Sequence, residues 1–408
     1  MIIFMKKAIL YFILIFILVT NGGNSYASTL RLMAMGEMQG IVEDDSDYKI
    51  DIASIASRQK NSLSVNYLFS NFTNKFPQNL TPSGAIYDLQ RKGVRDEYQI
   101  DAVYQVNPKF TFGLEYNKKI RDYRSSYINQ DGDWQRLERT GNEELKSIMV
   151  GYKVTDWLDL GLVYDDNVQS DTFDGTEASR EGVVAKENGS CSGLACGLRF
   201  HNPGFWFSLT AGENKGIDLT SQTISTTEVY HSTGPGRIGL RLGGRLWDGK
   251  ILINYGGCQR KFSHDSELKS FLGMQINSYE NMILGVGFAL KRETSRYLDF
   301  DNFSTNLGVE YSLPTNKNMK IRGGLINRYV DVRNFYMGVM RSTFQDYTFG
   351  LGYDWGKLKF DFAYKNYQDT PGGVDDWSAV SIPLAKDYVY TMTSERNSIY
   401  VFSVGYEM

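Results

Sequence analysis

The feature that most constrains this chain is a pair of alternating segments joined by a turn signal. In residues 237–247, arginine or glycine takes most odd positions, and the even positions are apolar except for Gly244. Asp248-Gly249 follows, a dipeptide typical of tight β-hairpins. Alternation then resumes over 251–258. Because alternate residues of a strand point to opposite faces, this pattern predicts a hairpin with one apolar and one arginine-bearing face.

A single hairpin of this kind would also suit a soluble sheet with its polar face in water. The alternation, however, recurs in stretches of about ten residues from Ser62 to the end of the sequence. Repetition of this kind is typical of a transmembrane β-barrel, whose apolar side chains face lipid and whose polar side chains face the lumen. The sequence therefore predicts an all-β, antiparallel transmembrane barrel of about 14–16 strands.

The N-terminus is predicted to direct export. Residues 1–27 contain two lysines, an apolar run over 8–19 and a small-x-small sequence that ends at Ala27. These are the parts of a secretory signal peptide, and the run is shorter than the roughly 20 residues that a spanning helix needs. No later segment is apolar over such a length. We therefore expect strands that contact the lipid bilayer in the outer membrane of a Gram-negative-type bacterium.

Composition narrows the classes of function. The formal net charge is −3, which gives no basic surface for nucleic acid. The chain has 27 Tyr, 23 Phe and 40 Gly but only 8 Pro, as suits many uninterrupted strands with aromatic girdles. The three cysteines are an odd number, and two of them lie too far apart along one expected strand to bridge, so no disulfide framework is expected.

Short turns and long polar connections alternate along residues 61–408, the predicted barrel domain. They separate about 16 strands, an even number as in bacterial outer-membrane barrels. The segment 267–276 supports a strand least well, and without it and one neighbour the count falls to about 14. In chain order, the expected strands are 62–70, 96–106, 109–119, 143–154, 157–165, 190–201, 204–213, 236–247, 249–260, 267–276, 280–292, 301–312, 318–328, 342–355, 357–367 and 397–408.

Aromatic residues support this assignment. Trp157, Trp206, Trp247 and Trp355 lie beside expected turns, where aromatic rings mark a membrane interface. Strand parity points Trp206 and Trp247 toward the lumen, so they could instead close the turn end of the barrel. Alternation also continues over 400–408. This last strand resembles the signal through which outer-membrane barrels reach the barrel-assembly machinery.

Residues 28–60 precede the first expected strand and carry short motifs. Their spacing resembles the N-terminal segment of the long-chain fatty acid outer-membrane transporter superfamily, whose barrels usually have 14 strands. In that family a Gly-Met-Gly-Gly run leads to an Asp-Asp pair and then to an Asn-Pro-Ala-Gly turn. Glu37 stands where the family has its second Gly, and residues 51–54 replace the turn. The matching residues are Met35, Gly36, Asp44 and Asp45.

The resemblance implies that residues 28–60 form a plug folded into the lumen and that hydrophobic ligands are taken up sideways through the barrel wall. The residues alone leave a second interpretation, a periplasmic tether with an acidic loop. We expect the plug, because the small apolar residues of this stretch suit burial inside a wide barrel.

Strand parity also places charged side chains on the lumen face. Arginines there could bind an anionic group, since a guanidinium pairs with a carboxylate through parallel hydrogen bonds. Alternatively, the charges pair across the lumen and hold the plug; this interpretation is favoured because barrel interiors are polar whatever they carry. The candidate ligand-binding residues are Arg237, Arg241, Arg245, Arg260, Arg322 and Arg328, with Lys320 on the same face. The carboxylates expected to face inward are Asp101, Glu115, Glu310, Asp346, Asp354 and Asp361.

Catalysis, cofactors and metals are not indicated. His201 lies at an expected turn, and His231 and His264 lie in expected loops. The dipeptide His264-Asp265 is weak support for a protease of the omptin type, whose barrels are smaller. No cluster has metal-ligand spacing. We therefore predict a protein that is not an enzyme and needs no cofactor.

Three functions remain open. The first is a channel for passive uptake of hydrophobic or amphipathic solutes such as fatty acids, which predicts an occluded lumen. The second is a general porin, which predicts open conductance and residues 368–396 folded inward. The third is a barrel that transports nothing and acts as a secretion accessory or surface scaffold, with a partner bound to long loops such as 71–95.

Overall fold

The computed structural model describes most of the chain after the expected signal peptide. Residues 1–27, the linker with Asp44 and Asp45, and most of 368–396 lie outside the described residues, so the expectations for them stay predictions. The described ranges are 28–39, 41–42, 51–58, 61–80, 86–128, 134–177, 180–214, 217–222, 227–232, 236–261, 266–279, 281–294, 298–334, 338–368, 393–394 and 396–407.

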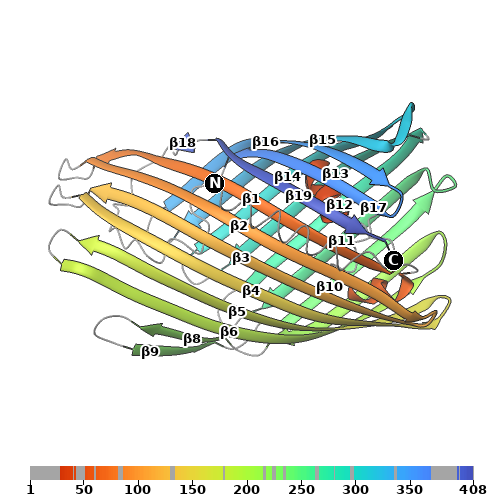
Figure 1. Cartoon of the computed structure of the whole chain (residues 1–408), viewed down its shortest axis with the longest axis horizontal. Coiled ribbons are helices and arrows are strands. Elements are labelled where there is room, and N and C mark those ends of the chain that lie inside the picture. Colours follow the sequence, from red (N-terminus) through yellow and green to blue (C-terminus); the bar gives the residue numbers. More distant parts are fainter. Residues whose placement is uncertain are drawn as a thin grey trace.

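These residues form a closed antiparallel β-barrel of sixteen strands (Figure 1), which confirms the predicted fold and its upper strand count. The barrel closes where β1 pairs with β19. The wall strands are β1 (Ser62–Leu80), β2 (Ile86–Asn107), β3 (Phe110–Ile128), β4 (Trp134–Thr155), β5 (Leu158–Glu177), β6 (Arg180–His201), β7 (Phe205–Asn214), β10 (Gly236–Leu246), β11 (Ile251–Lys261), β12 (Ser266–Tyr279), β13 (Met282–Thr294), β14 (Leu298–Leu313), β15 (Asn316–Asn334), β16 (Gly338–Trp355), β17 (Leu358–Gln368) and β19 (Arg396–Tyr406).

Three short strands lie outside this ring of sixteen. The hairpin of β8 (Ile217–Gln222) and β9 (Thr227–Ser232) pairs with β6, while β7 itself pairs with β10. The two-residue β18 (Thr393–Ser394) pairs with β1. All sixteen expected strands overlap a wall strand in the same order, including 267–276, which is part of β12.

Several strands are longer than the alternation predicts. Strand β4 has 22 residues, and its pairing with β3 continues well beyond the expected start at residue 143. Beyond the expected end of β3 both faces of this pair of strands carry charges: Arg124 pairs with Glu138 at 3.6 Å, and on the other face Arg121 pairs with Glu143 at 2.6 Å. With no apolar face to alternate against, the period-two signal disappears although the backbone pairing continues.

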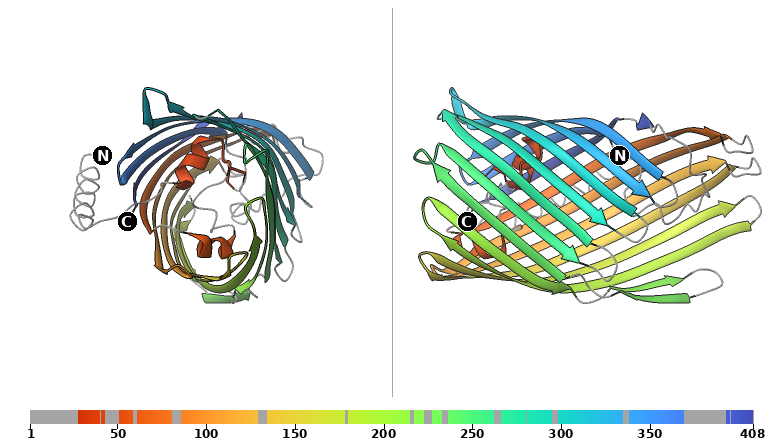
Figure 2. Two further views of the ribbon diagram at one scale, coloured as in Figure 1. Left: turned by 90° about the vertical axis from the view of Figure 1, so that its right-hand side faces the viewer. Right: turned by 180° about the vertical axis from the view of Figure 1, so that it is seen from behind.

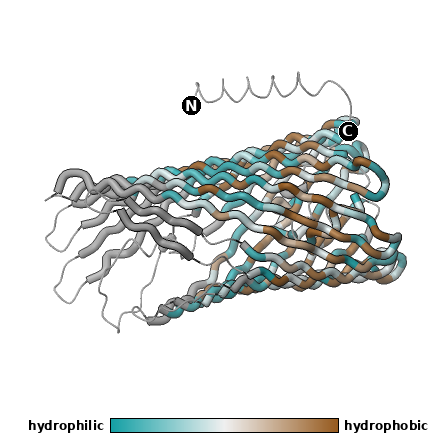
Figure 3. The backbone as a smooth tube through the Cα atoms, turned by 90° about the horizontal axis from the view of Figure 1, so that it is seen from below, coloured by the Kyte–Doolittle hydropathy of each residue, from teal (hydrophilic) through white to brown (hydrophobic). Residues whose placement is uncertain are grey.

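The wall is tall on one side and low on the other (Figure 2). Strands β2, β4 and β6 each have 22 residues, whereas β7 has 10 and β10 and β11 have 11. Apolar residues gather in the part of the barrel nearest the short turns (Figure 3), which we call the turn end. There, outward-facing side chains such as Leu160, Leu162 and Tyr164 are exposed while the intervening Val163 is buried.

The tryptophans at the turn end divide between the two faces. Trp157, Trp247 and Trp355 are exposed, whereas Trp206 is 4% exposed and lies on the lumen face, as its parity predicted. The lumen-facing alternative for Trp247 was wrong. It belongs to a four-residue turn whose residues 247–249 all have left-handed backbone, with φ of 51°, 54° and 82°. This turn is longer than the expected two residues and interrupts strand parity.

Two short helices lie within the barrel ring when it is viewed along its axis (Figure 2). They are α2 (Ser28–Ala34) and the 3₁₀ helix η2 (Ile52–Ser57). No helix in the described ranges has the length and apolar character to cross a membrane. We call residues 28–39 with 41–42 the first lumen segment, and residues 51–58 the second lumen segment.

Candidate functional site

The two lumen segments dock on opposite walls of the barrel. The first contacts β12 to β17 and β19, and the second contacts β3 to β6. Both are strongly apolar on their buried sides. The first packs Leu32, Met35, Met38, Ile41 and Val42 together, and the second packs Ile52 and Ile55 against wall residues such as Met149. The described parts of both segments lie inside the ring against its wall; that residues 28–60 act as a plug stays a prediction.

Inward-facing glycines form the sockets for both segments. A Cβ at Gly308 would lie 2.0 Å from the carbonyl oxygen of Met35, and a Cβ at Gly161 would lie 2.4 Å from that of Ile52. Such distances are possible only without a side chain, so these positions require glycine. The wall also donates hydrogen bonds to backbone carbonyls of the first segment, where Asn306 Nδ2 reaches Gly36 O at 2.7 Å. Similar bonds run from Thr348 Oγ1 to Ala34 O (2.8 Å) and from Asn254 Nδ2 to Ile41 O (2.9 Å).

Enlarging a socket glycine should detach the segment above it. In Gly308→Val the new side chain collides with backbone of the first lumen segment, so amide hydrogen exchange at residues 35–42 should rise by at least an order of magnitude. Gly239→Val is the matched control, because a Cβ at that lumen position meets its nearest atom at 3.5 Å. Hydrogen exchange followed by mass spectrometry measures both variants. Equal protection of residues 35–42 in the two would contradict the socket interpretation.

A buried ion cluster joins the wall to the first segment. The Arg322 side chain is 3% exposed and lies between Glu310 and Asp361. Its Nε donates to Glu310 Oε2 at 2.7 Å, and Arg31 of the first segment donates to the same oxygen at 2.9 Å. A second wall pair, Lys320 with Asp354 at 2.8 Å, lies close enough for both groups to act electrostatically on Asp361.

A second cluster fixes the other segment near the turn end. Arg199 Nε lies 3.7 Å from the buried carboxylate of Asp51, and Arg241 also acts on it electrostatically. Burial raises the pKa of the Asp51 carboxyl above its ordinary value, although both guanidinium groups oppose this rise. Ser57 donates a hydrogen bond to Asp159, and His201 Nε2 lies 3.0 Å from that same carboxylate. Arg241 therefore belongs to the charged surroundings of the second lumen segment.

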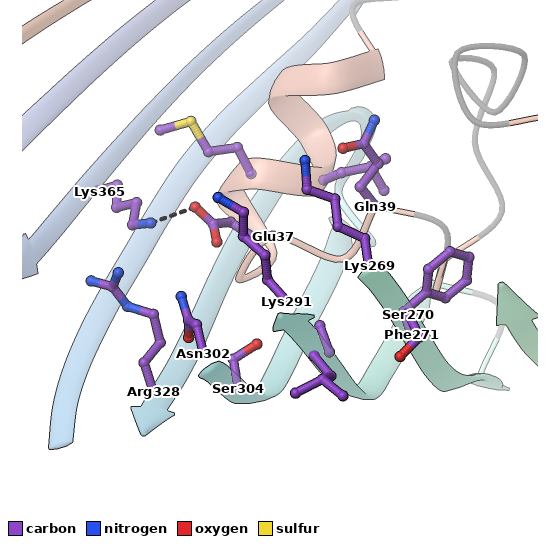
Figure 4. A pocket seen from close by; sticks show the side chains of 14 residues that line it. Glu37, Gln39, Lys269, Ser270, Phe271, Lys291, Asn302, Ser304, Arg328 and Lys365 are labelled. Atoms are coloured by element: carbon purple, nitrogen blue, oxygen red, sulfur yellow. Dashed lines mark hydrogen bonds and ion pairs between the residues drawn. The ribbon is translucent and has the colours of Figure 1, made fainter. Parts of the chain in front are cut away.

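A pocket of about 520 Å³ lies between the first lumen segment and the wall (Figure 4). Its lining combines apolar side chains with four cations and one carboxylate. The cations Lys269 and Lys291 extend from β12 and β13, whereas Arg328 and Lys365 approach from β15 and β17. The lining residues are Leu32, Met33, Glu37, Gln39, Lys269, Ser270, Phe271, Ala289, Leu290, Lys291, Asn302, Ser304, Arg328 and Lys365.

The six candidate arginines have different surroundings. Among those with described side chains, only Arg328 lines the pocket. Arg245 lies exposed at the turn end, where it donates to Pro203 O at 3.0 Å and stacks over Trp206. Arg237 is half-buried on β10, and the side chain of Arg260 lies outside the described residues. Arg241 and Arg322 belong to the two ion clusters described above.

The sequence interpretation missed the three lysines and the glutamate of this pocket. Lys269, Lys291 and Lys365 stand in expected strands, and their parity could have assigned them to the lumen as it did Arg328. Glu37 was noticed only as a departure from a family motif. Its side chain is directed by the turn after α2, which strand parity cannot describe.

Glu37 is held in the pocket by its charge. The Lys365 ammonium donates a hydrogen bond to its carboxylate, and Arg328 adds a favourable electrostatic interaction. Enclosure by the barrel works to raise the pKa of the Glu37 carboxyl, but these cations outweigh it and hold that pKa below its ordinary value. Asp346, which is 0% exposed, lies 2.8 Å from Arg328 Nη2 and 3.6 Å from Lys365 Nζ.

Comparisons with known proteins address the fold. No family model matches the chain, and no curated protein matches it by sequence. Among solved structures, a FadL homologue from Pseudomonas aeruginosa is similar, with a TM-score of 0.51 and 12% sequence identity. The match covers 95% of this chain and 100% of the homologue. The toluene transporter TodX of P. putida has a TM-score of 0.50 and 14% identity, with coverages of 95% and 99%.

The fold resembles that of FadL-type barrels. CdiB from Acinetobacter baumannii reaches the same TM-score of 0.51 as the FadL homologue, but the match covers only 60% of that chain. The agreement over whole chain length therefore favours the FadL type, and it confirms the resemblance found in the sequence at the level of fold. The sixteen strands are two more than the 14 usual for that family.

Proposed function

We propose that this protein is an outer-membrane channel for passive uptake of a hydrophobic or amphipathic small molecule such as a fatty acid. The observation that carries the proposal is the occupied lumen: both lumen segments lie inside the barrel, and a pocket remains beside the first. The similar structures include a protein described as a toluene transporter, which supports the same class of solute. The outward apolar belt suits a lipid bilayer. Export through residues 1–27, insertion by the barrel-assembly machinery and a plug spanning 28–60 belong to this proposal.

The pocket has the size and lining for one amphipathic molecule. Ligand sites commonly measure about 300–1,000 Å³, and this pocket falls within that range. Leu32, Met33 and Phe271 offer apolar contacts, while Lys365 and Arg328 can pair with a carboxylate. This combination suits an acyl chain that carries one anionic group better than it suits a sugar or a bare ion.

The wall beside the pocket is continuous in the described strands. Lys269 pairs in register with Lys291, and Lys291 with Asn302, so no lateral gap opens between β12, β13 and β14 at this level. We therefore propose that the ligand reaches this pocket along the lumen. Sideways passage through the wall, which the family resemblance implied, stays a prediction for other levels of the barrel.

Filling the pocket should abolish uptake. In Ala289→Trp an indole would occupy the cavity, whereas Leu272→Trp places the same ring on the outward face of the adjacent strand as a control. We expect radiolabelled dodecanoate to accumulate in Gram-negative cells that lack their own fatty acid channel when they express the unaltered chain or Leu272→Trp, but to stay at background with Ala289→Trp.

Permeation of a hydrophilic β-lactam by the same cells separates the alternatives. Rapid β-lactam permeation through the unaltered chain would favour a general porin. No flux of either compound, with the barrel correctly assembled in the outer membrane, would favour a secretion accessory or surface scaffold.

A further inference from the structure

We infer that Glu37 occupies the anion subsite of the pocket and must leave it when an anionic ligand binds. This inference rests on the proposed function and adds an internal competitor that couples ligand binding to release of the first lumen segment. The subsite consists of Lys365 and Arg328, which lie beside Glu37 (Figure 4). Both cations also contact Asp346.

The backbone conformation at Glu37 is strained for a residue with a side chain. Its φ is +58°, directly after Gly36 at +83°, in the left-handed region that favours glycine. A glycine here would relieve the strain. A glutamate at such a position is therefore consistent with a specific role for its carboxylate, and the ion pair with Lys365 supplies one.

Charge balance decides that a carboxylate must leave when the ligand arrives. Two cations, Lys365 and Arg328, face two carboxylates, Glu37 and Asp346. The other two cations of the pocket, Lys269 and Lys291, are paired with Glu267 and Glu293 on their own strands, so they leave no excess positive charge. A ligand carboxylate in the same place would leave three anions against two cations, and such an excess is poorly screened inside the barrel.

Of the two protein carboxylates, Glu37 is the one free to move away. Asp346 is 0% exposed and is held from strand β16 by both cations. The Glu37 side chain is 47% exposed and belongs to a strained turn. The ligand therefore displaces Glu37 from Lys365.

Displacement of Glu37 acts directly on the socket of the first lumen segment. Its neighbour Gly36 fits against Gly324, where a Cβ on Gly324 would lie 2.2 Å from Gly36 N. Gly36 O also accepts the hydrogen bond from Asn306. The second lumen segment is held separately through Asp51 and Ser57. Ligand binding should thus loosen the first segment and leave the second in place.

The test compares two ligands of equal chain length on the full chain in detergent micelles. Isothermal titration of E37Q should show dodecanoate binding about tenfold more tightly than in the unaltered chain, the effect of losing one charge-assisted competitor. Dodecanol, which carries no charge to compete with, should bind equally to both. E37G removes the strain as well as the charge and should also bind dodecanoate more tightly. D354N is the control that removes a lumen carboxylate paired with Lys320 away from the pocket, and it should change neither affinity.

A second measurement uses the unaltered chain and does not depend on any variant folding. Dodecanoate, but not dodecanol, should increase amide hydrogen exchange at residues 35–38, with no change at 52–57. Equal dodecanoate affinity in E37Q and the unaltered chain, or unchanged exchange at 35–38, overturns this inference and leaves the proposed uptake function standing. Absence of dodecanoate binding in every form overturns both.

Discussion

Deletion of residues 28–60 should convert a closed barrel into an open pore. Both lumen segments are lost, while the wall keeps its continuous pairing from Ser62 onward. A barrel of about 16 strands is wide enough to contain an aqueous channel once nothing fills it. In planar lipid bilayers we expect the intact mature chain to conduct rarely and the truncated chain to show steady conductance that is larger by more than an order of magnitude.

Partial deletions show whether each lumen segment contributes separately to closing the pore. Because the two segments dock on opposite walls, removal of residues 28–42 alone should open a smaller pathway on the side of β12 to β17. Steady conductance of the intact chain at the level of the truncated chain would sink the idea that these segments occlude the lumen. Silence of both forms would instead favour a barrel that transports nothing.

Replacement of Arg322 by methionine should have the largest effect on stability of any charge change in the wall. Its side chain lies buried between Glu310 and Asp361, so its loss leaves the buried Asp361 carboxylate without its ion-pair partner and Glu310 with Arg31 alone. Breaking a buried pair by removing one partner costs about 3–5 kcal/mol. Unfolding by guanidinium in detergent micelles, followed by loss of β-sheet circular dichroism, measures the change.

Two further variants identify the physical cause of this loss. Arg292→Met removes an arginine from a surface pair with Asp301, where the Arg292 side chain is 54% exposed. It should lower the guanidinium concentration at the unfolding midpoint far less than Arg322→Met does. The triple variant R322M/E310Q/D361N neutralises the stranded carboxylates and should recover much of the lost stability. If R322M alone unfolds at the same midpoint as R292M, the buried cluster is not a source of stability.

The number and order of the strands could be predicted because each carries its own signal. Outward residues near the turn end meet an apolar medium and inward residues a polar lumen, so alternation is present in every strand, even in 267–276. The extensions of β2 to β6 gave no such signal, because their faces are polar on both sides. Their pairing depends on backbone hydrogen bonds with a neighbouring strand, which side-chain alternation does not report.

The interior was only partly predictable. Parity placed Arg322, Glu310 and Asp361 on the lumen face, and the structure shows that they pair with one another along one wall rather than across the lumen. It could not show that Arg31 completes this cluster, because that contact joins residues 279 positions apart. Equally, the socket glycines looked like ordinary strand residues until the segments that fill them were in place.

The sequence by itself determined the barrel, since facing lipid on one side and water on the other leaves a period of two in each strand. The tertiary structure decided what the lumen contains. It determined which glycines contact the two lumen segments, which charged side chains form ion pairs, and that Glu37 pairs with Lys365. Those outcomes depend on residues brought together from distant strands across a closed ring, and no local pattern records such distances.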